Sequence, residues 1–261
     1  MKTTSRTISA LSIVASLGLA ALPSAQAALM LASSVNGTNI CAVDNDASVC
    51  TWGVQISDTN PTVGFLGLGT TVAPIVVGGV EVFGSLHIAE FLSGLNSIRS
   101  SSLQIINTTL APVHITVAVS ATDFVGPSVE YAASGSGTWT TAAGSSIDLE
   151  WYNDPANAQG AETPADRPGN LLNAATDMAF GPVDSFSFNF PGGPGFLPLA
   201  IPDLGMYSMT LAFDIDLVGG GRLTSRGQNL VKPIALPEPG TLSLLAMTLG
   251  LLGWRLRKTA A

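Results

Sequence analysis

The chain has 261 residues, of which 46% are hydrophobic and only 11% are charged, against roughly 25% charged residues in an average soluble domain. Gly, Ser, Thr, Asn and Ala replace the missing charge, and this mixture favours an extracellular β-protein over a cytosolic enzyme because it forms turns and strands better than helices. Between Ala28 and Leu236, five basic residues stand against 17 acidic ones, so this segment carries a net charge of −12 and repels the phosphates of a nucleic acid.

The first 27 residues have the three parts of a signal peptide in the expected order. Lys2 and Arg6 are the positive region, 8–22 is an apolar run, and Ala25 and Ala27 form the small-x-small cleavage site. The alternative is a transmembrane anchor, for which the apolar run is short. We therefore predict export, with signal peptidase cutting after Ala27.

Cys41 and Cys50 are the only cysteines, and a pair of cysteines in an exported chain favours one disulfide. The turn residues 44–46 separate two β-prone runs, so we expect the disulfide to close a hairpin. A redox pair would have Cys-x-x-Cys spacing, and a zinc site would need more ligands. We predict neither a metal nor any other cofactor.

Alternating apolar and polar residues predict antiparallel strands that place one face on a core. The clearest runs are 102–107, 113–120, 147–152, 185–190 and 206–218. Helical patterning is weak and is confined to 82–95, and 135–139 is expected to be a turn. Many short strands separated by Gly- and Pro-rich segments predict an all-β fold, an antiparallel β-sandwich-like passenger domain over 28–236.

The C-terminal segment has a rigid start, an apolar helix candidate and a basic cluster. These parts are Pro237-Glu238-Pro239, then Thr241–Trp254, then Arg255, Arg257 and Lys258. At 1.5 Å per residue the helix candidate is about 21 Å long, shorter than the roughly 30 Å hydrocarbon core of a membrane. The segment is therefore a marginal stop-transfer helix with its basic cluster in the cytoplasm and the acidic domain outside.

This order and spacing over 237–258 resembles the PEP-CTERM sorting signal of Gram-negative bacteria. The resemblance implies processing by exosortase, a membrane-embedded cysteine protease or transpeptidase, in a host that makes exopolysaccharide. It also implies transient anchoring in the inner membrane, followed by a periplasmic, cell-surface or matrix location. The alternative is a plain C-terminal anchor, and the resemblance assigns no role to the passenger.

The sequence offers few candidates for catalysis. His87 and His114 are the only histidines, and no Gly-x-Ser-x-Gly motif accompanies them. Asp148 and Glu150 share a strand face, as a glycosidase pair would, but this spacing is common on any solvated sheet. The main hypothesis is therefore a non-enzymatic protein of the cell surface or exopolysaccharide matrix.

Three alternatives remain open. A carbohydrate-binding module would use Trp139, Trp151 and Tyr152 as stacking faces, so exposure of these rings would support it and burial of all three would exclude it. A secreted hydrolase would need a cleft that joins a histidine to a serine and a carboxylate. A calcium site would draw on carboxylates such as those in 44–46 or 214–216, although the full EF-hand spacing is absent.

Overall fold

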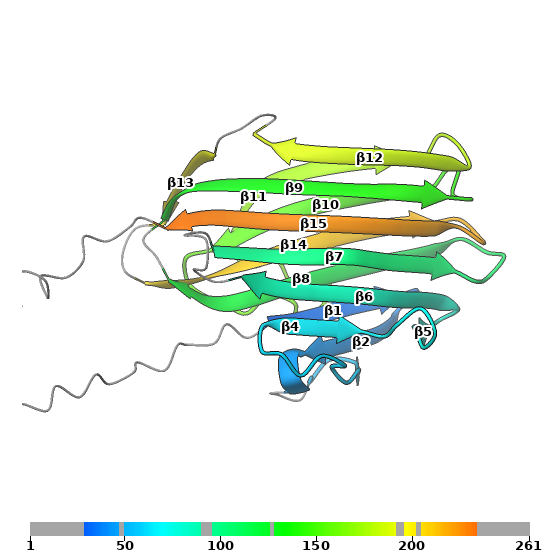
Figure 1. Cartoon of the computed structure of the whole chain (residues 1–261), viewed down its shortest axis with the longest axis horizontal. Helices are drawn as coiled ribbons and strands as arrows, with labels where there is room; N and C mark the ends of the chain where they lie inside the picture. Colours follow the sequence, from blue (N-terminus) through cyan, green and yellow to red (C-terminus); the bar gives the residue numbers. More distant parts are fainter. Residues whose placement is uncertain are drawn as a thin grey trace, which may run out of the picture.

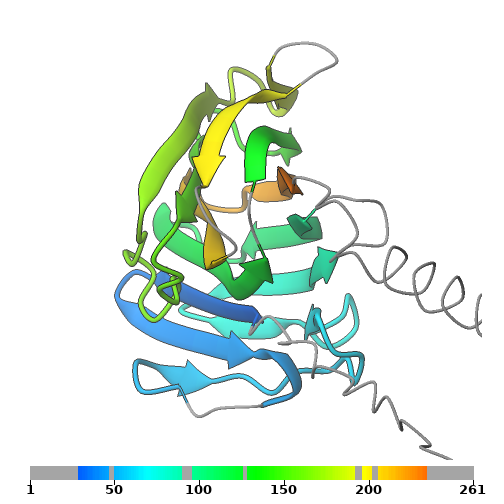
Figure 2. The same cartoon turned by 90° about the vertical axis from the view of Figure 1, so that its left-hand side faces the viewer.

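The computed structural model describes residues 29–46, 50–89, 96–125, 128–191, 196–201 and 205–233. These residues form almost entirely β-structure, arranged as two sheets packed face to face (Figure 1, Figure 2). Over these ranges no helix is long and apolar enough to cross a membrane. The predicted signal peptide and the PEP-CTERM segment lie outside the described residues, as do the domain boundaries drawn at them.

Sheet A has seven strands. In spatial order they are β11 (Asn170–Met178), β10 (Ser146–Asp154), β14 (Met206–Leu217), β8 (Val113–Val125), β1 (Leu29–Val35), β2 (Thr38–Val43) and β3 (Val54–Gln55). All of these pairs are antiparallel except β2 with β3.

Sheet B has eight strands and lies in front of sheet A in Figure 1. Its main path is β12 (Val183–Phe190), β9 (Ser128–Thr140), β15 (Arg222–Pro233), β7 (Asn96–Asn107), β6 (Val80–Ala89) and β4 (Phe65–Leu68). Two short strands complete it, β13 (Leu197–Ile201) beside β9 and β5 (Ile75–Val77) beside β6. The predicted all-β fold with packed antiparallel sheets is thus confirmed for the described residues.

The core lies between the two sheets and follows the period-two pattern of the sequence. In β14, the alternate residues Met209, Leu211, Phe213, Ile215 and Leu217 are all fully buried. Burial of such a side chain stabilises a fold by roughly 1.5–3 kcal/mol. The strand could not slip by one residue without turning this whole set toward solvent.

Three local predictions are wrong. The disulfide between Cys41 and Cys50 is present, but it does not close a hairpin, because β3 runs parallel to β2 instead of returning from it. The short helix expected within 82–95 is wrong for 82–89, which belong to β6, and residues 90–95 lie outside the described ranges. The expected turn at 135–139 lies inside β9, where Gly135 and Gly137 are paired on both sides.

Candidate functional site

The outer face of sheet A is partly covered by the loop 155–169. Ala161 is fully buried there against Ala32 and Ala118, and the Gly160 amide donates to Ser120 Oγ at 3.0 Å. Because the loop occupies the middle of this face, the face offers little continuous surface to a large ligand.

Arg167 holds the end of the same loop on sheet A. Its guanidinium lies 2.8 Å from Glu150 Oε2 and 2.5 Å from Asp214 Oδ2, on β10 and β14. Burial alone would lower the pKa of Arg167, but the hydrogen bond and charge of Asp214, together with the charge of Glu150, raise it above its usual value. Arg167 therefore stays charged and links the loop to two neighbouring strands.

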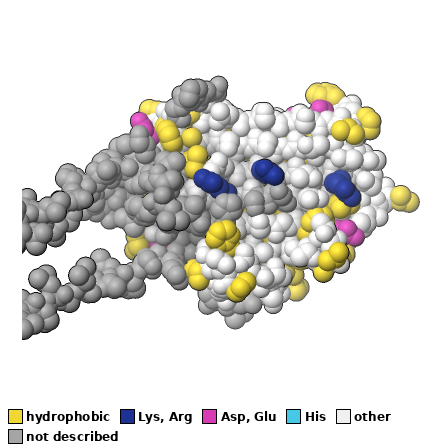
Figure 3. Space-filling model, in the orientation of Figure 1, with side chains coloured by type: hydrophobic (Ala, Val, Ile, Leu, Met, Phe, Trp, Pro, Cys, Tyr) yellow, Lys and Arg dark blue, Asp and Glu magenta, His cyan; other side chains and the backbone are white. Residues whose placement is uncertain are grey.

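The outer face of sheet B is open and carries mainly hydroxyl, amide and guanidinium groups. Alternation along β9, β12, β15 and β7 turns these side chains outward while the apolar partners face the core. The set is Ser134, Ser136, Thr138 and Thr140; Ser185, Ser187 and Asn189; Arg222, Thr224, Arg226 and Gln228; and Arg99 and Gln104. Figure 3 shows this face, with basic side chains in a row across it and acidic ones at its margin.

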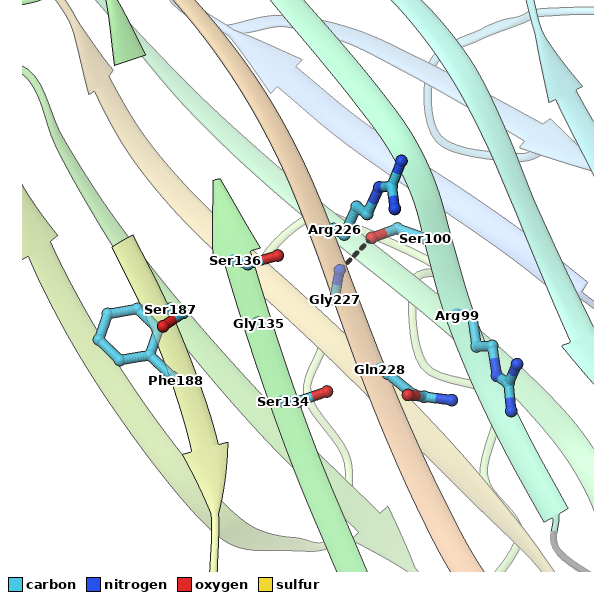
Figure 4. Close-up of a pocket in the computed structure, with 10 residues that line it drawn as sticks. All are labelled: Arg99, Ser100, Ser134, Gly135, Ser136, Ser187, Phe188, Arg226, Gly227 and Gln228. Carbon is cyan, nitrogen blue, oxygen red and sulfur yellow. Dashed lines mark hydrogen bonds between the residues drawn. The ribbon is translucent and has the colours of Figure 1, made fainter. Parts of the chain in front are cut away.

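A hollow of about 330 Å³ lies on this face across β12, β9, β15 and β7. Its polar lining is formed by seven residues: Arg99, Ser100, Ser134, Ser136, Ser187, Arg226 and Gln228 (Figure 4). No carboxylate is among the lining residues in the described part of the chain. We call this feature the sheet B hollow.

A β-bulge shapes one side of the sheet B hollow. Ser225 pairs with Leu103 and Gly227 with Ser100, so β7 has one residue more than β15 at this point. The Ser100 hydroxyl accepts a hydrogen bond of 2.6 Å from the Gly227 amide, as Figure 4 shows. Bulges of this kind re-aim side chains, and here the bulge lies directly beside Arg226.

Arg99 and Gln228 face each other across β7 and β15. With the Gln228 amide turned so that its oxygen faces the guanidinium, that oxygen accepts from Arg99 Nη2 at 2.9 Å and from Nε as well. This contact orients the Arg99 side chain and leaves its remaining N–H donors for another partner.

The predicted aromatic contacts are not on this surface, and two of them are corrected by the structure. Trp139 and Trp151 are both fully buried in the core, and the Trp139 indole N–H donates to Asp177 Oδ2 at 2.8 Å. Neither ring can stack on a sugar. Tyr152 is half-buried on sheet A, where burial and its hydrogen bond to Glu150 raise its pKa.

The hydrolase alternative requires a cleft that joins a histidine to a serine and a carboxylate, and His114 does not lie in such a cleft. His114 Nδ1 lies 2.8 Å from Asp216 Oδ1 and Nε2 lies 3.3 Å from the Thr116 hydroxyl. These groups share the outer face of sheet A, where the His114 and Asp216 side chains are 59% and 68% exposed. The group has a hydroxyl, an imidazole and a carboxylate, but it lies on an exposed face, away from the sheet B hollow. The side chain of His87 lies outside what the structure describes.

Three of the predicted calcium ligands, Asp44, Asp214 and Asp216, are already bound by protein groups. Asp44 accepts from the Gly64 amide at 2.6 Å, and burial is the main cause that raises its pKa. Asp214 and Asp216 are bound by Arg167 and His114. Within the described ranges, no group of three or more His, Cys, Asp or Glu side chains is placed to hold a metal ion.

Sequence reasoning did not find the residues that line the sheet B hollow. Arg99 and Arg226 lie far apart in the chain, and only the register of β7 against β15 brings them together. The one sequence feature that could have indicated this site is a pattern in the strands. There, the few basic residues of an acidic segment alternate with Ser, Thr and Gln. That pattern does not reveal which strands are neighbours.

No protein-family model matches the chain, and no curated protein matches it. Solved structures that it matches include TmCBM61 in complex with β-1,4-galactotriose, at 10% identity over 56% of this chain and 88% of that one, with a TM-score of 0.29. The family 11 carbohydrate-binding module from Clostridium thermocellum, in complex with a β-1,3-1,4-mixed-linked tetrasaccharide, matches at 11% identity over 77% and 96%, with a TM-score of 0.27. TmCBM27, a mannan-recognising module, matches at 11% identity over 65% and 88%, with a TM-score of 0.28. At these scores the likeness does not extend to a ligand or to binding residues.

Proposed function

We propose that the chain is an exported, non-enzymatic polysaccharide-binding protein and that the outer face of sheet B is its binding surface. The observation that carries this proposal is the sheet B hollow, whose lining combines four serine hydroxyls, an amide and two guanidiniums. A polysaccharide presents hydroxyl groups and ring oxygens, which such a lining can bind with many hydrogen bonds. The hollow spans four strands, so its shape is held by the sheet and not by mobile loops.

The location of the lining also favours binding over catalysis. A nucleophile needs an activating base within hydrogen-bond reach, and the lining contains neither a histidine nor a carboxylate among the described residues. His114 and Asp216 lie on the other sheet. The proposed role is therefore recognition, which corresponds to the carbohydrate-binding alternative of the sequence analysis.

We further propose that the PEP-CTERM segment sorts this binding domain to the cell surface or exopolysaccharide matrix. Export by the signal peptide would place the acidic domain outside, and exosortase would process the segment beginning at Pro237. The proposed binding of polysaccharide is consistent with this location, because the tail resembles a signal typical of hosts that make exopolysaccharide. In this scheme the apolar segment Thr241–Trp254 holds the protein in the inner membrane until processing.

Affinity electrophoresis tests the binding role. The full-length chain, purified in a mild detergent, should migrate more slowly through gels that contain a suitable polysaccharide than through gels without it. The panel should include neutral and anionic polymers as well as the exopolysaccharide of the producing strain. Equal mobility in every gel would refute polysaccharide binding.

The sorting role has a separate test. Replacing Pro237, Glu238 and Pro239 by Ala should leave export and membrane retention intact but abolish processing, so an uncleaved membrane-bound form should accumulate. An immunoblot against a C-terminal tag detects that form. If the variant is cut and released like the parent, the tail is only an anchor.

A further inference from the structure

The described charges are unevenly distributed between the two outer faces. Three of the four arginines whose side chains are described lie on sheet B, and the fourth, Arg167, forms ion pairs on sheet A. Four carboxylates lie on the outer face of sheet A, Asp148, Glu150, Asp214 and Asp216, whereas Glu81 and Glu130 lie at the margins of the outer face of sheet B, outside the hollow. A segment with a net charge of −12 thus presents a basic row on one side (Figure 3).

The basic row coincides with the sheet B hollow. Arg99 and Arg226 line it, and Arg222 lies further along β15 on the same face. Guanidinium groups bind carboxylates and sulfates in a bidentate geometry that neutral hydroxyls cannot reproduce. A recess lined by charges of one sign concentrates the opposite ion, so the chemistry of the hollow favours an anionic ligand over a neutral one.

The spacing of the arginines favours a polymer over a single small anion. Arg226 and Gln228 are two residues apart on one face of β15, about 6.6 Å at strand rise, and Arg99 faces Gln228 on the next strand. Arg222 is four residues from Arg226, about 13 Å along the same strand. One small anion cannot contact all three side chains, whereas an extended chain with repeated anionic groups can.

Other ligand classes fit this face less well. Proteins that bind single-stranded nucleic acids without sequence preference stack the bases on exposed aromatic rings. Here Trp139 and Trp151 are buried, and Phe188 is the one aromatic residue among the described lining residues. Duplex DNA carries one negative charge per about 1.7 Å of its axis, so the net charge of −12 repels it more strongly than it repels a polysaccharide of lower charge density. Hydroxyl groups beside the arginines suit the sugar hydroxyls of a polysaccharide.

We propose that the sheet B hollow binds an anionic polysaccharide, with Arg99 and Arg226 contacting its carboxylate or sulfate groups and Arg222 extending the row. The inference rests on the proposed function and specifies its ligand class. The serines of β9 and β12 then contact the neutral part of each sugar unit. Affinity should fall as salt rises, because part of the binding is electrostatic.

The test compares polymers that differ in charge alone. The full-length chain in detergent is titrated with polygalacturonate, its fully methyl-esterified form, dextran sulfate, dextran and duplex DNA at low and high salt. We expect binding to polygalacturonate or dextran sulfate, at least about tenfold weaker binding to the matched neutral polymer, and weaker binding at high salt. Whichever of the two anionic polymers binds more tightly shows whether the site prefers carboxylate or sulfate groups.

A matched pair of variants assigns the binding to the arginines. R99Q combined with R226Q should weaken binding to the anionic polymer at least about tenfold. L110E combined with A174E changes the net charge by the same amount at exposed positions off sheet B and should bind like the parent. Melting temperatures equal to that of the parent show that both double variants are folded.

Each other outcome is decisive. Equal binding of charged and neutral polymers, unaffected by R99Q and R226Q, would overturn the anionic ligand and leave polysaccharide binding intact. Equal loss in both double variants would show that net charge and not the hollow controls binding. Preferential binding of duplex DNA would overturn the ligand class. Binding of no polymer, including the producing strain's own, would refute the proposed function itself.

Discussion

Gly135 of β9 lies directly opposite Gly227 of β15, immediately behind the sheet B hollow. A Cβ atom at Gly227 would approach Leu211 Cδ2 to 2.7 Å, and one at Gly135 would approach Leu149 Cδ2 to 2.9 Å. The two glycines therefore let large side chains of sheet A pack against the backbone of sheet B. The backbone that forms the floor of the hollow is therefore supported directly by core side chains.

Gly227→Ala should destabilise the fold. The new methyl group would meet the side chains of Leu211 and Phe213, and overpacking of this kind costs about 1–3 kcal/mol. Gly205→Ala is the control, because a Cβ there would meet nothing within 4 Å. Urea unfolding followed by circular dichroism measures both variants, and equal stability would contradict the close packing of the sheets.

Removal of the disulfide should weaken the fold without abolishing it. Cys41 and Cys50 are nine residues apart, and closing a loop of this length stabilises a protein by about 2.5 kcal/mol in the chain-entropy model. Replacing both by Ser should lower the free energy of unfolding by an amount of that order. Addition of a reductant to the parent should have the same effect and should leave the double variant unchanged.

Trp139→Ala should act on stability and not directly on binding. The ring is fully buried and its N–H is bound to Asp177, so truncation should cost about 3–5 kcal/mol. Phe180→Ala is a control on an 87% exposed ring and should be nearly neutral. If Trp139→Ala kept the parent stability but lost polysaccharide binding, the ring would be a stacking surface and its placement in the core would be wrong.

Asp184 should make a pH-dependent contribution to stability. Hydrogen bonds from the amides of Phe180 and Ser185 lower its pKa below the ordinary 3.8. A carboxyl group whose pKa is lower in the folded state stabilises the fold above its unfolded pKa, and the effect disappears as the pH falls through the folded pKa. Asp184→Asn should therefore melt earlier than the parent at pH 6, with a difference that shrinks below pH 3.8. A difference independent of pH would contradict this account.

The sequence was sufficient to predict the strands whose two faces differ most in polarity. In β14 the apolar residues alternate without interruption, and burial of one face decides both the strand and its orientation. The disulfide followed from the cysteine count. Its surrounding hairpin did not, because the pairing of the short β3 is set by tertiary contacts and not by the turn residues between the cysteines.

Two further failures have a common physical cause. The glycines of 135–139 were expected to form a turn, but close packing between the sheets also requires glycine. The carbohydrate-binding alternative requires Trp139 and Trp151 at a surface because exposed aromatic rings bind sugars, whereas most tryptophans are largely buried. In both cases the distance between two sheets decides the outcome, and a single sequence carries no measure of that distance.

The measurement that tests the central claim most directly is a steric block of the sheet B hollow. Ser134→Gln combined with Ser136→Gln adds neutral bulk to the lining without changing any charge. Ala143→Gln combined with Ala174→Gln adds similar bulk at exposed positions off this face. Isothermal titration with the polysaccharide that the parent binds best should show binding weakened at least about tenfold in the first variant and unchanged in the second. Unchanged binding in the first variant, with an unchanged melting temperature, would contradict the claim that the outer face of sheet B is the binding surface.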